Sequence, residues 1–201
     1  MQFHLIYEGP LPAHTQRKHR VEEKHNIRRI FHKQLAKLWV EHPFLKTRSD
    51  LKFPDAHDAS RIVSWVGAHA SAYNRSGYNF LPLVGSLFDI ACSLDILFLR
   101  RNDPGDLVKK GGDIDNRIKV LFDALRIPEK CNELPENAKP GLGEDPFYCL
   151  LENDQLITGV RITTDRLLTP ANSQDSQNDV VLVIRVRTMG TGASTFTALA
   201  T

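Results

Sequence analysis

The sequence predicts an α+β protein in which a mixed sheet of about four strands carries helices on one face. Four segments have the alternating or continuous apolar character of strands, two longer segments place apolar residues at helical spacing, and no internal repeat is visible. A chain of 201 residues is long enough for one domain with a substantial core. We therefore expect a single domain over residues 1–189, with insertions at about 47–87 and 126–148 and a disordered tail over 190–201.

The N-terminal half predicts a strand, a helix and an irregular segment. Residues 3–7 alternate and are rich in β-forming types, and a Gly-Pro-Leu-Pro run ends them. Residues 20–40 place apolar side chains at roughly helical spacing until a His-Pro pair ends the pattern. Residues 47–83 mix Pro, Asp, Ser, Asn and Gly with scattered aromatic residues, so we expect irregular structure there with one short strand.

The C-terminal half predicts three strands and a second helix. Residues 88–99 are typical of a long buried strand, and residues 114–125 carry one apolar stripe that a proline three residues later ends. Residues 129–145 form a loop longer than most, which is either an insertion or a functional lid. Two further strands are expected at about 155–163 and 180–187.

The composition excludes several classes of protein. Hydrophobic residues make up 41 % and charged residues 25 %, and no apolar run approaches the roughly 18 residues that a membrane span needs. The first residues lack the pattern of a secretory signal. Three cysteines without a CxxC pair indicate reduced thiols rather than a disulfide framework or a zinc site. We expect a cytoplasmic protein with no membrane partner and no small-molecule cofactor.

Positive charge is concentrated near the N-terminus. The net charge is only +2, but residues 1–50 contain ten Lys and Arg against five Asp and Glu. Two interpretations of the basic helix stay open: its cations contact phosphates, or they form a solvated face. The basic loop with Arg100, Arg101, Lys109 and Lys110 is a second candidate for phosphate contacts.

Histidines are also concentrated near the N-terminus, where six of the eight lie within residues 1–50. His14, His19, His25 and His32 have mixed spacing without a metal-ligand pattern. We therefore expect them to be surface residues without a functional role.

An acidic motif opens the second helix. If Asp113 is the N-cap, Asp115, Lys119 and Asp123 follow at i, i+4 and i+8 along one side of the helix. Two carboxylates in a small volume are tolerated when they share a cation, and Mg²⁺ prefers oxygen ligands. Spacing alone is equally compatible with a capped helix that carries an exposed row of salt bridges.

A third carboxylate is available from the run Glu152-Asn153-Asp154-Gln155, just before a predicted strand. A turn at this place would cluster these side chains. Spacing does not decide which of them would complete a metal site.

Residues 112–125, Gly-Asp-Ile-Asp-Asn-Arg-Ile-Lys-Val-Leu-Phe-Asp-Ala-Leu, resemble the D-x-D-N-x-x-K-x-x-x-D-A-L signature of RusA-type Holliday-junction resolvases. The resemblance extends over about residues 88–168, with a closing strand near 180–189. It implies a RusA-like α+β fold and a metal-dependent, structure-selective endodeoxyribonuclease of DNA recombination and repair, using Mg²⁺ or Mn²⁺. It also implies a homodimer that resolves branched, four-way DNA.

The resemblance also implies roles for individual residues. Asp113 and Asp115 match the first two metal-binding carboxylates of the family, and Lys119 matches its essential lysine. The family shows two adjacent acids, one spacer and Gln, so that Asn153 stands here at the key acid position. Asp154, nearer to the predicted strand, is our favoured replacement, and Glu152 is the other candidate metal ligand.

Three hypotheses follow for the activity. The first is a Mg²⁺-dependent endonuclease with Asp113, Asp115, Lys119 and Asp154 as its catalytic residues. The second is a non-catalytic DNA-binding or phage-type regulatory protein on the same fold, which the Asn153 departure motivates. The third is a phosphohydrolase acting on small nucleotides, because the same carboxylate chemistry serves any phosphoester.

Overall fold

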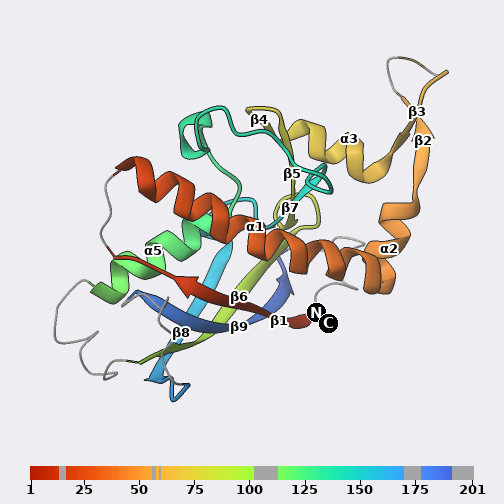
Figure 1. Cartoon of the computed structure of the whole chain (residues 1–201). Coiled ribbons are helices and arrows are strands. Elements are labelled where there is room, and N and C mark those ends of the chain that lie inside the picture. Colours follow the sequence, from red (N-terminus) through yellow and green to blue (C-terminus); the bar gives the residue numbers. More distant parts are fainter. Residues whose placement is uncertain (14–16, 56–57, 59, 102–112, 170–177, 192–201) are drawn as a thin grey trace.

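The computed structural model describes residues 1–13, 17–55, 58, 60–101, 113–169 and 178–191, and it shows an α+β protein (Figure 1). The helices are α1 (Arg17–Glu41), α2 (Pro43–Asp50), α3 (Trp65–Ala72) and α5 (Asp113–Leu125), with short 3₁₀ turns η1 (Cys131–Glu133) and η2 (Asp154–Leu156). The strands are β1 (Gln2–Pro10), β2 (Lys52–Pro54), β3 (Ile62–Ser64), β4 (Asn74–Arg75), β5 (Tyr78–Val84), β6 (Ile90–Arg100), β7 (Phe147–Leu151), β8 (Ile157–Arg166) and β9 (Asp179–Gly190).

The main sheet has four strands in the order β1-β9-β6-β8. β9 pairs antiparallel with both β1 and β6, whereas β8 pairs parallel with β6. Helices α1 and α5 lie on the same side of this sheet (Figure 1). The predicted mixed sheet of four strands with helices on one face is therefore confirmed.

The central strand β6 explains why the sheet has one covered face. Its side chains alternate, so that Leu94, Ile96 and Phe98 are at most 2 % exposed, while Ser93 and Asp95 between them are only partly buried. Successive side chains of a strand point to opposite faces. The apolar residues therefore face the helices, and the polar residues lie on the open face.

Helix α1 covers the sheet with an apolar stripe. Ile27, Phe31, Leu35 and Trp39 recur every four residues and are at most 2 % exposed. Residues four apart lie on one face of a helix. The ring of Phe31 packs against Tyr7 of β1 with centroids 6.1 Å apart, so this stripe joins the helix to the edge of the sheet.

The prediction of irregular structure over residues 47–83 was wrong. This segment contains α3 and most of β5, and β5 pairs parallel with β7, whose first two residues are the last two of the second predicted insertion. These strands build one small sheet, in the order β4-β5-β7. Their pairing joins residues about 67 positions apart, and local sequence patterns do not report a partner at that distance.

Two further expectations concern the C-terminal tail and membrane-spanning segments. The predicted tail lies mostly outside the described residues, since the description ends at residue 191. Within the described ranges, no helix has the length and apolar character needed to cross a membrane.

Candidate metal centre

Helix α5 presents one charged pair to solvent near its start. Nζ of Lys119 lies 2.8 Å from Oδ2 of Asp115, and both side chains are about two-thirds exposed, at 68 % and 65 %. Leu121 and Leu125 are buried on the opposite side of the helix. Asp113 begins the helix, but its side chain lies outside what the structure describes.

The start of α5 is anchored by Arg117. Its guanidinium is buried and donates hydrogen bonds to the carbonyl oxygen of Leu11 and, over 3.1 Å, to Oδ1 of Asn178. Leu11 follows β1 and Asn178 precedes β9. Asp115 therefore lies beside the ends of two strands of the main sheet, on a helix turn that Arg117 anchors to these ends.

Asp123, the last acid of the predicted stripe, serves the interior instead. Its carboxylate lies 3.0 Å from Nζ of Lys24 and 3.0 Å from Nη2 of Arg126. Its carbonyl oxygen accepts a hydrogen bond of 2.8 Å from Arg28. Lys24 and Arg28 belong to α1, so Asp123 ties the two helices together and is not directed with Asp115 toward solvent.

The turn at residues 152–154 uses two of its three side chains locally. Oε2 of Glu152 accepts hydrogen bonds from the backbone nitrogen of Ser86 at 2.7 Å and from its hydroxyl at 2.8 Å. Asn153 caps η2 by accepting a hydrogen bond from the backbone of Gln155 at 3.1 Å. Asp154 is exposed at the first position of η2. Asp154 is therefore the carboxylate of this turn that is not engaged by these local bonds.

Gly85 lies close to the carboxylate of Glu152. A Cβ atom at Gly85 would lie 2.6 Å from Oε2 of Glu152, so a side chain there would displace this carboxylate from its observed position. Gly85 thus lets the carboxylate reach the backbone of Ser86. This arrangement gives Glu152 a structural role at the turn between β5 and β6.

The turn and the start of α5 lie toward opposite ends of the helix. Arg126 forms a β-bridge with Leu151, and the backbone nitrogen of Ile127 donates to the Leu151 carbonyl over 2.9 Å. Asp115 precedes Arg126 by eleven residues, which is about 16 Å along a helix axis. In the described part of the chain, no three acidic, cysteine or histidine side chains are grouped to hold a metal ion. The structure thus brings Asp115 to Lys119 and leaves Glu152 and Asp154 apart from them.

Three cations of α1, the predicted basic helix, contact other elements of the fold. Lys24 and Arg28 are 8 % and 1 % exposed, and Arg29 lies 2.8 Å from Oε1 of Glu144. Burial lowers the pKa of Arg28. Lys24 and Arg28 therefore do not lie on a solvated face, because their side chains hold α1 against α5. That the basic helix contacts phosphates stays a prediction. Lys33 and Lys37 remain exposed.

The basic loop was the other candidate for phosphate contacts. Lys109 and Lys110 lie outside the described residues. Arg100 is only 7 % exposed, and Nε of Arg101 donates to the carbonyl oxygen of Thr169 over 3.2 Å. Of these two arginines Arg100 is buried and Arg101 is partly exposed, and phosphate contact by this loop stays a prediction.

Two histidines that were expected at the surface are buried. His25 and His32 are 2 % and 4 % exposed. Burial, followed by the nearby cations Arg28 and Arg29, lowers the pKa of His25 to about 4. Their spacing of seven residues places both histidines on one side of α1, which is a signal that their sequence positions contained. His14 and the side chain of His19 lie outside the described residues.

The hydrogen bonds of His32 require a neutral ring. Its Nδ1 accepts from the backbone nitrogen of Tyr148 at 2.9 Å, so its Nε2 donates to the carbonyl oxygen of Gly143 at 3.0 Å. Burial lowers the pKa of His32. The ring therefore fastens α1 to β7 and to the loop before it.

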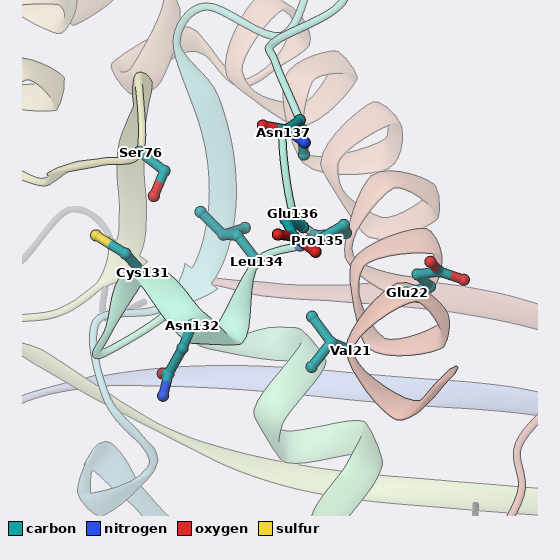
Figure 2. Close-up of a pocket in the computed structure, with 10 residues that line it drawn as sticks. Val21, Glu22, Ser76, Cys131, Asn132, Leu134, Pro135, Glu136 and Asn137 are labelled. Carbon is teal, nitrogen blue, oxygen red and sulfur yellow. The ribbon is translucent and has the colours of Figure 1, made fainter. Parts of the chain in front are cut away.

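A separate hollow of about 740 Å³ lies between η1, the following loop and the start of α1 (Figure 2). Its lining includes Cys131, Glu22 and Glu136. A hydrogen bond with Ser76 lowers the pKa of Cys131. None of the site residues predicted from the sequence lines this hollow.

Comparison of the chain with protein families, with curated proteins and with solved structures finds no match to any of them.

Proposed function

We propose that the chain is a RusA-like, Mg²⁺-dependent endonuclease that cuts branched DNA from a centre at the start of α5. The proposal includes a homodimer, in which two-fold symmetry would present two such centres to two related phosphates of a four-way junction. It also includes a cytoplasmic location, in keeping with three free cysteines.

The observation that carries the proposal is the exposed pair of Asp115 and Lys119 within the signature. Oδ2 of Asp115 lies 2.8 Å from Nζ of Lys119, two-thirds of each side chain is exposed, and Asp115 stands two residues after Asp113. Exposed pairs of this kind contribute little to stability, typically about 0.2–1 kcal/mol. The pair is thus accessible to a large substrate at small cost to the fold.

The residues present fit a magnesium ion. Mg²⁺ is commonly held by one or two carboxylates, with waters and substrate phosphates as its other ligands. Asp113 and Asp115 would hold it, and Mn²⁺ takes the same oxygen ligands. Asp154, toward the other end of α5, is not needed for a site of this kind, and Glu152 is engaged with Ser86.

When bound, the ion polarises a phosphate and lowers the pKa of a coordinated water. The contribution of the chain itself is positioning and charge. Asp115 holds the Lys119 ammonium on the exposed side of the helix, where it can approach a phosphate as a compact point charge. Lys119 then stabilises the negative charge that develops on the phosphate during cleavage.

The test is cleavage of a synthetic four-way junction with Mg²⁺ by the full chain and by Asp115→Asn. We expect the substitution to lower the cutting rate by about a hundredfold or more, since it removes a ligand and the partner of Lys119. Asp50→Asn is the matched control, because Asp50 forms an exposed pair with Lys46, also four residues apart, at 3.3 Å on α2. Equal cutting by the wild type and Asp115→Asn would refute the catalytic assignment.

A non-catalytic DNA-binding protein is the second candidate function. The favouring observation is that Asn153 stands in a capping role where the family pattern expects an acid, while Glu152 serves the turn. No cutting by the wild type, together with tight binding of the junction that weakens steeply with salt, would select this alternative.

A further inference from the structure

The face of the main sheet that lies away from α1 and α5 carries a row of arginines. Strand pairing places Arg185 of β9 and Arg161 of β8 on either side of Asp95 of β6. The neighbouring row contains Arg187, then Ser93, then Gly159. Residues in register on adjacent strands point to the same face. Three guanidinium groups therefore surround two of the smallest residues of the sheet.

These residues form a groove. It has a volume of about 410 Å³, and its lining includes Ser93, Asp95, Gly159, Arg161, Arg185 and Arg187. Ser93 and Gly159 make its floor, because neither has a side chain large enough to fill the space between the arginines. A Cβ atom at Gly159 would approach Ser93 no closer than 3.8 Å, so the hollow is open to a larger group.

The charges of the groove are not neutralised by ion pairs. Among the described residues, Arg161, Arg185, Arg187 and Asp95 have no salt bridge within 4.0 Å. Nε of Arg185 lies 3.4 Å from Nε2 of His4, and Nε of Arg187 lies 3.1 Å from Oε1 of Gln2, so neither partner is a carboxylate. The groove thus has an excess of two positive charges over its one acid. A surface with this net charge attracts anions.

An apolar row borders the charged rows. Strand pairing aligns Ile6, Val183 and Leu97 on the same face, and Ile6 is 53 % exposed. A ligand that lies across both rows therefore meets guanidinium groups and an apolar strip. Nucleotides combine a charged phosphate with an apolar base face in this way.

We propose that this groove binds the phosphodiester backbone of a nucleic-acid strand. The planar fork of arginine suits phosphate oxygens, and two side chains at i and i+2 of one strand are about 6.7 Å apart, so that Arg185 and Arg187 can engage different phosphates. The groove lies on the opposite side of the sheet from α5 and forms a second contact surface. The inference rests on the proposed function only in sharing its substrate class.

The test measures binding of a fluorescein-labelled single-stranded oligodeoxynucleotide by anisotropy, in EDTA and on the Asp115→Asn background. Absence of cleavage therefore does not affect it. We expect Arg185→Gln and Arg187→Gln each to weaken binding and to reduce the slope of log affinity against log salt by about one. Arg61→Gln, at an exposed position of the β2–β3 connection, removes the same charge elsewhere and is the control.

A second variant tests the groove without removing an arginine. Gly159→Glu places a carboxylate on the groove floor, where the backbone accepts a side chain, and should weaken binding at least as much as either arginine change. Thermal melting verifies that each variant folds.

Three results would overturn the proposal. The first is wild-type affinity in Arg185→Gln, Arg187→Gln and Gly159→Glu, each folded. The second is equal competition by inorganic phosphate at the same phosphate concentration, which would assign the groove to a free anion. The third is a change of oligomeric state in light scattering with unchanged affinity, which would assign the face to a second copy of the chain.

Discussion

Asp123→Asn tests whether Asp123 and Asp115, which the sequence placed on one stripe of α5, have different roles. The substitution keeps the volume of the side chain and removes its charge. It leaves Lys24 and Arg126, whose side chains are 10 % and 9 % exposed, without a carboxylate that lies 3.0 Å from each. Stability should therefore fall although nothing near Asp115 changes.

The magnitude follows from these exposures. Breaking a fully buried ion pair by removing one partner costs about 3–5 kcal/mol. Two features reduce that figure here: Asp123 itself is 32 % exposed, and Arg126 keeps Glu133 at 3.1 Å. We expect a loss of about 2–3 kcal/mol. For a chain of this size, that corresponds to a fall in Tm of about 5–10 °C.

Thermal unfolding followed by circular dichroism measures the effect. Asp115→Asn is the matched control, because its pair with Lys119 is exposed and worth at most about 1 kcal/mol. A Tm for Asp123→Asn within about 2 °C of the wild type, or an equal fall in Asp115→Asn, would refute the reasoning.

Three further predictions concern pH, catalysis and the turn. The pKa of His25 is about 4 in the folded protein and about 6.5 in the unfolded chain, so unfolding takes up a proton between these pH values. The contribution of His25 to the free energy of unfolding is therefore fully present above pH 6.5 and falls by about 3 kcal/mol on going to pH 4. Urea titrations should show a flatter pH profile for His25→Gln, and an unchanged profile would contradict this. Lys119→Met should slow junction cutting by about a hundredfold with Tm within a few degrees of the wild type, whereas cutting at the wild-type rate would remove Lys119 from the centre. Glu152→Ala should cost about 1–2 kcal/mol through its lost bonds to Ser86 and leave the Mg²⁺ concentration for half-maximal cutting unchanged; a raised requirement would place Glu152 among the metal ligands.

The elements predicted with most success are those whose pattern is long and local. Helix α5 and strand β6 were placed within about two residues of their observed bounds, since an apolar stripe and an apolar run each report a buried face. Strand β5 was not placed: one short strand was expected somewhere in residues 47–83, without bounds, although the residues of β5 are nearly all buried. Its partner β7 lies far along the chain, so its burial depends on a contact that no local window contains.

The candidate site likewise has features that the sequence predicted and features that only the structure shows. The sequence by itself determined the α+β class, the helix that carries Asp115 and Lys119, and their adjacency, because four residues make about one helical turn. Only the tertiary structure decided that Asp123 faces α1, that Glu152 binds Ser86 and that His25 is buried. Periodicity along one element fixes which side chains share a face. Which neighbour that face meets depends on packing between segments distant in sequence. Among the described residues, that packing also leaves Arg161, Arg185 and Arg187 on the open side of the sheet without a salt bridge.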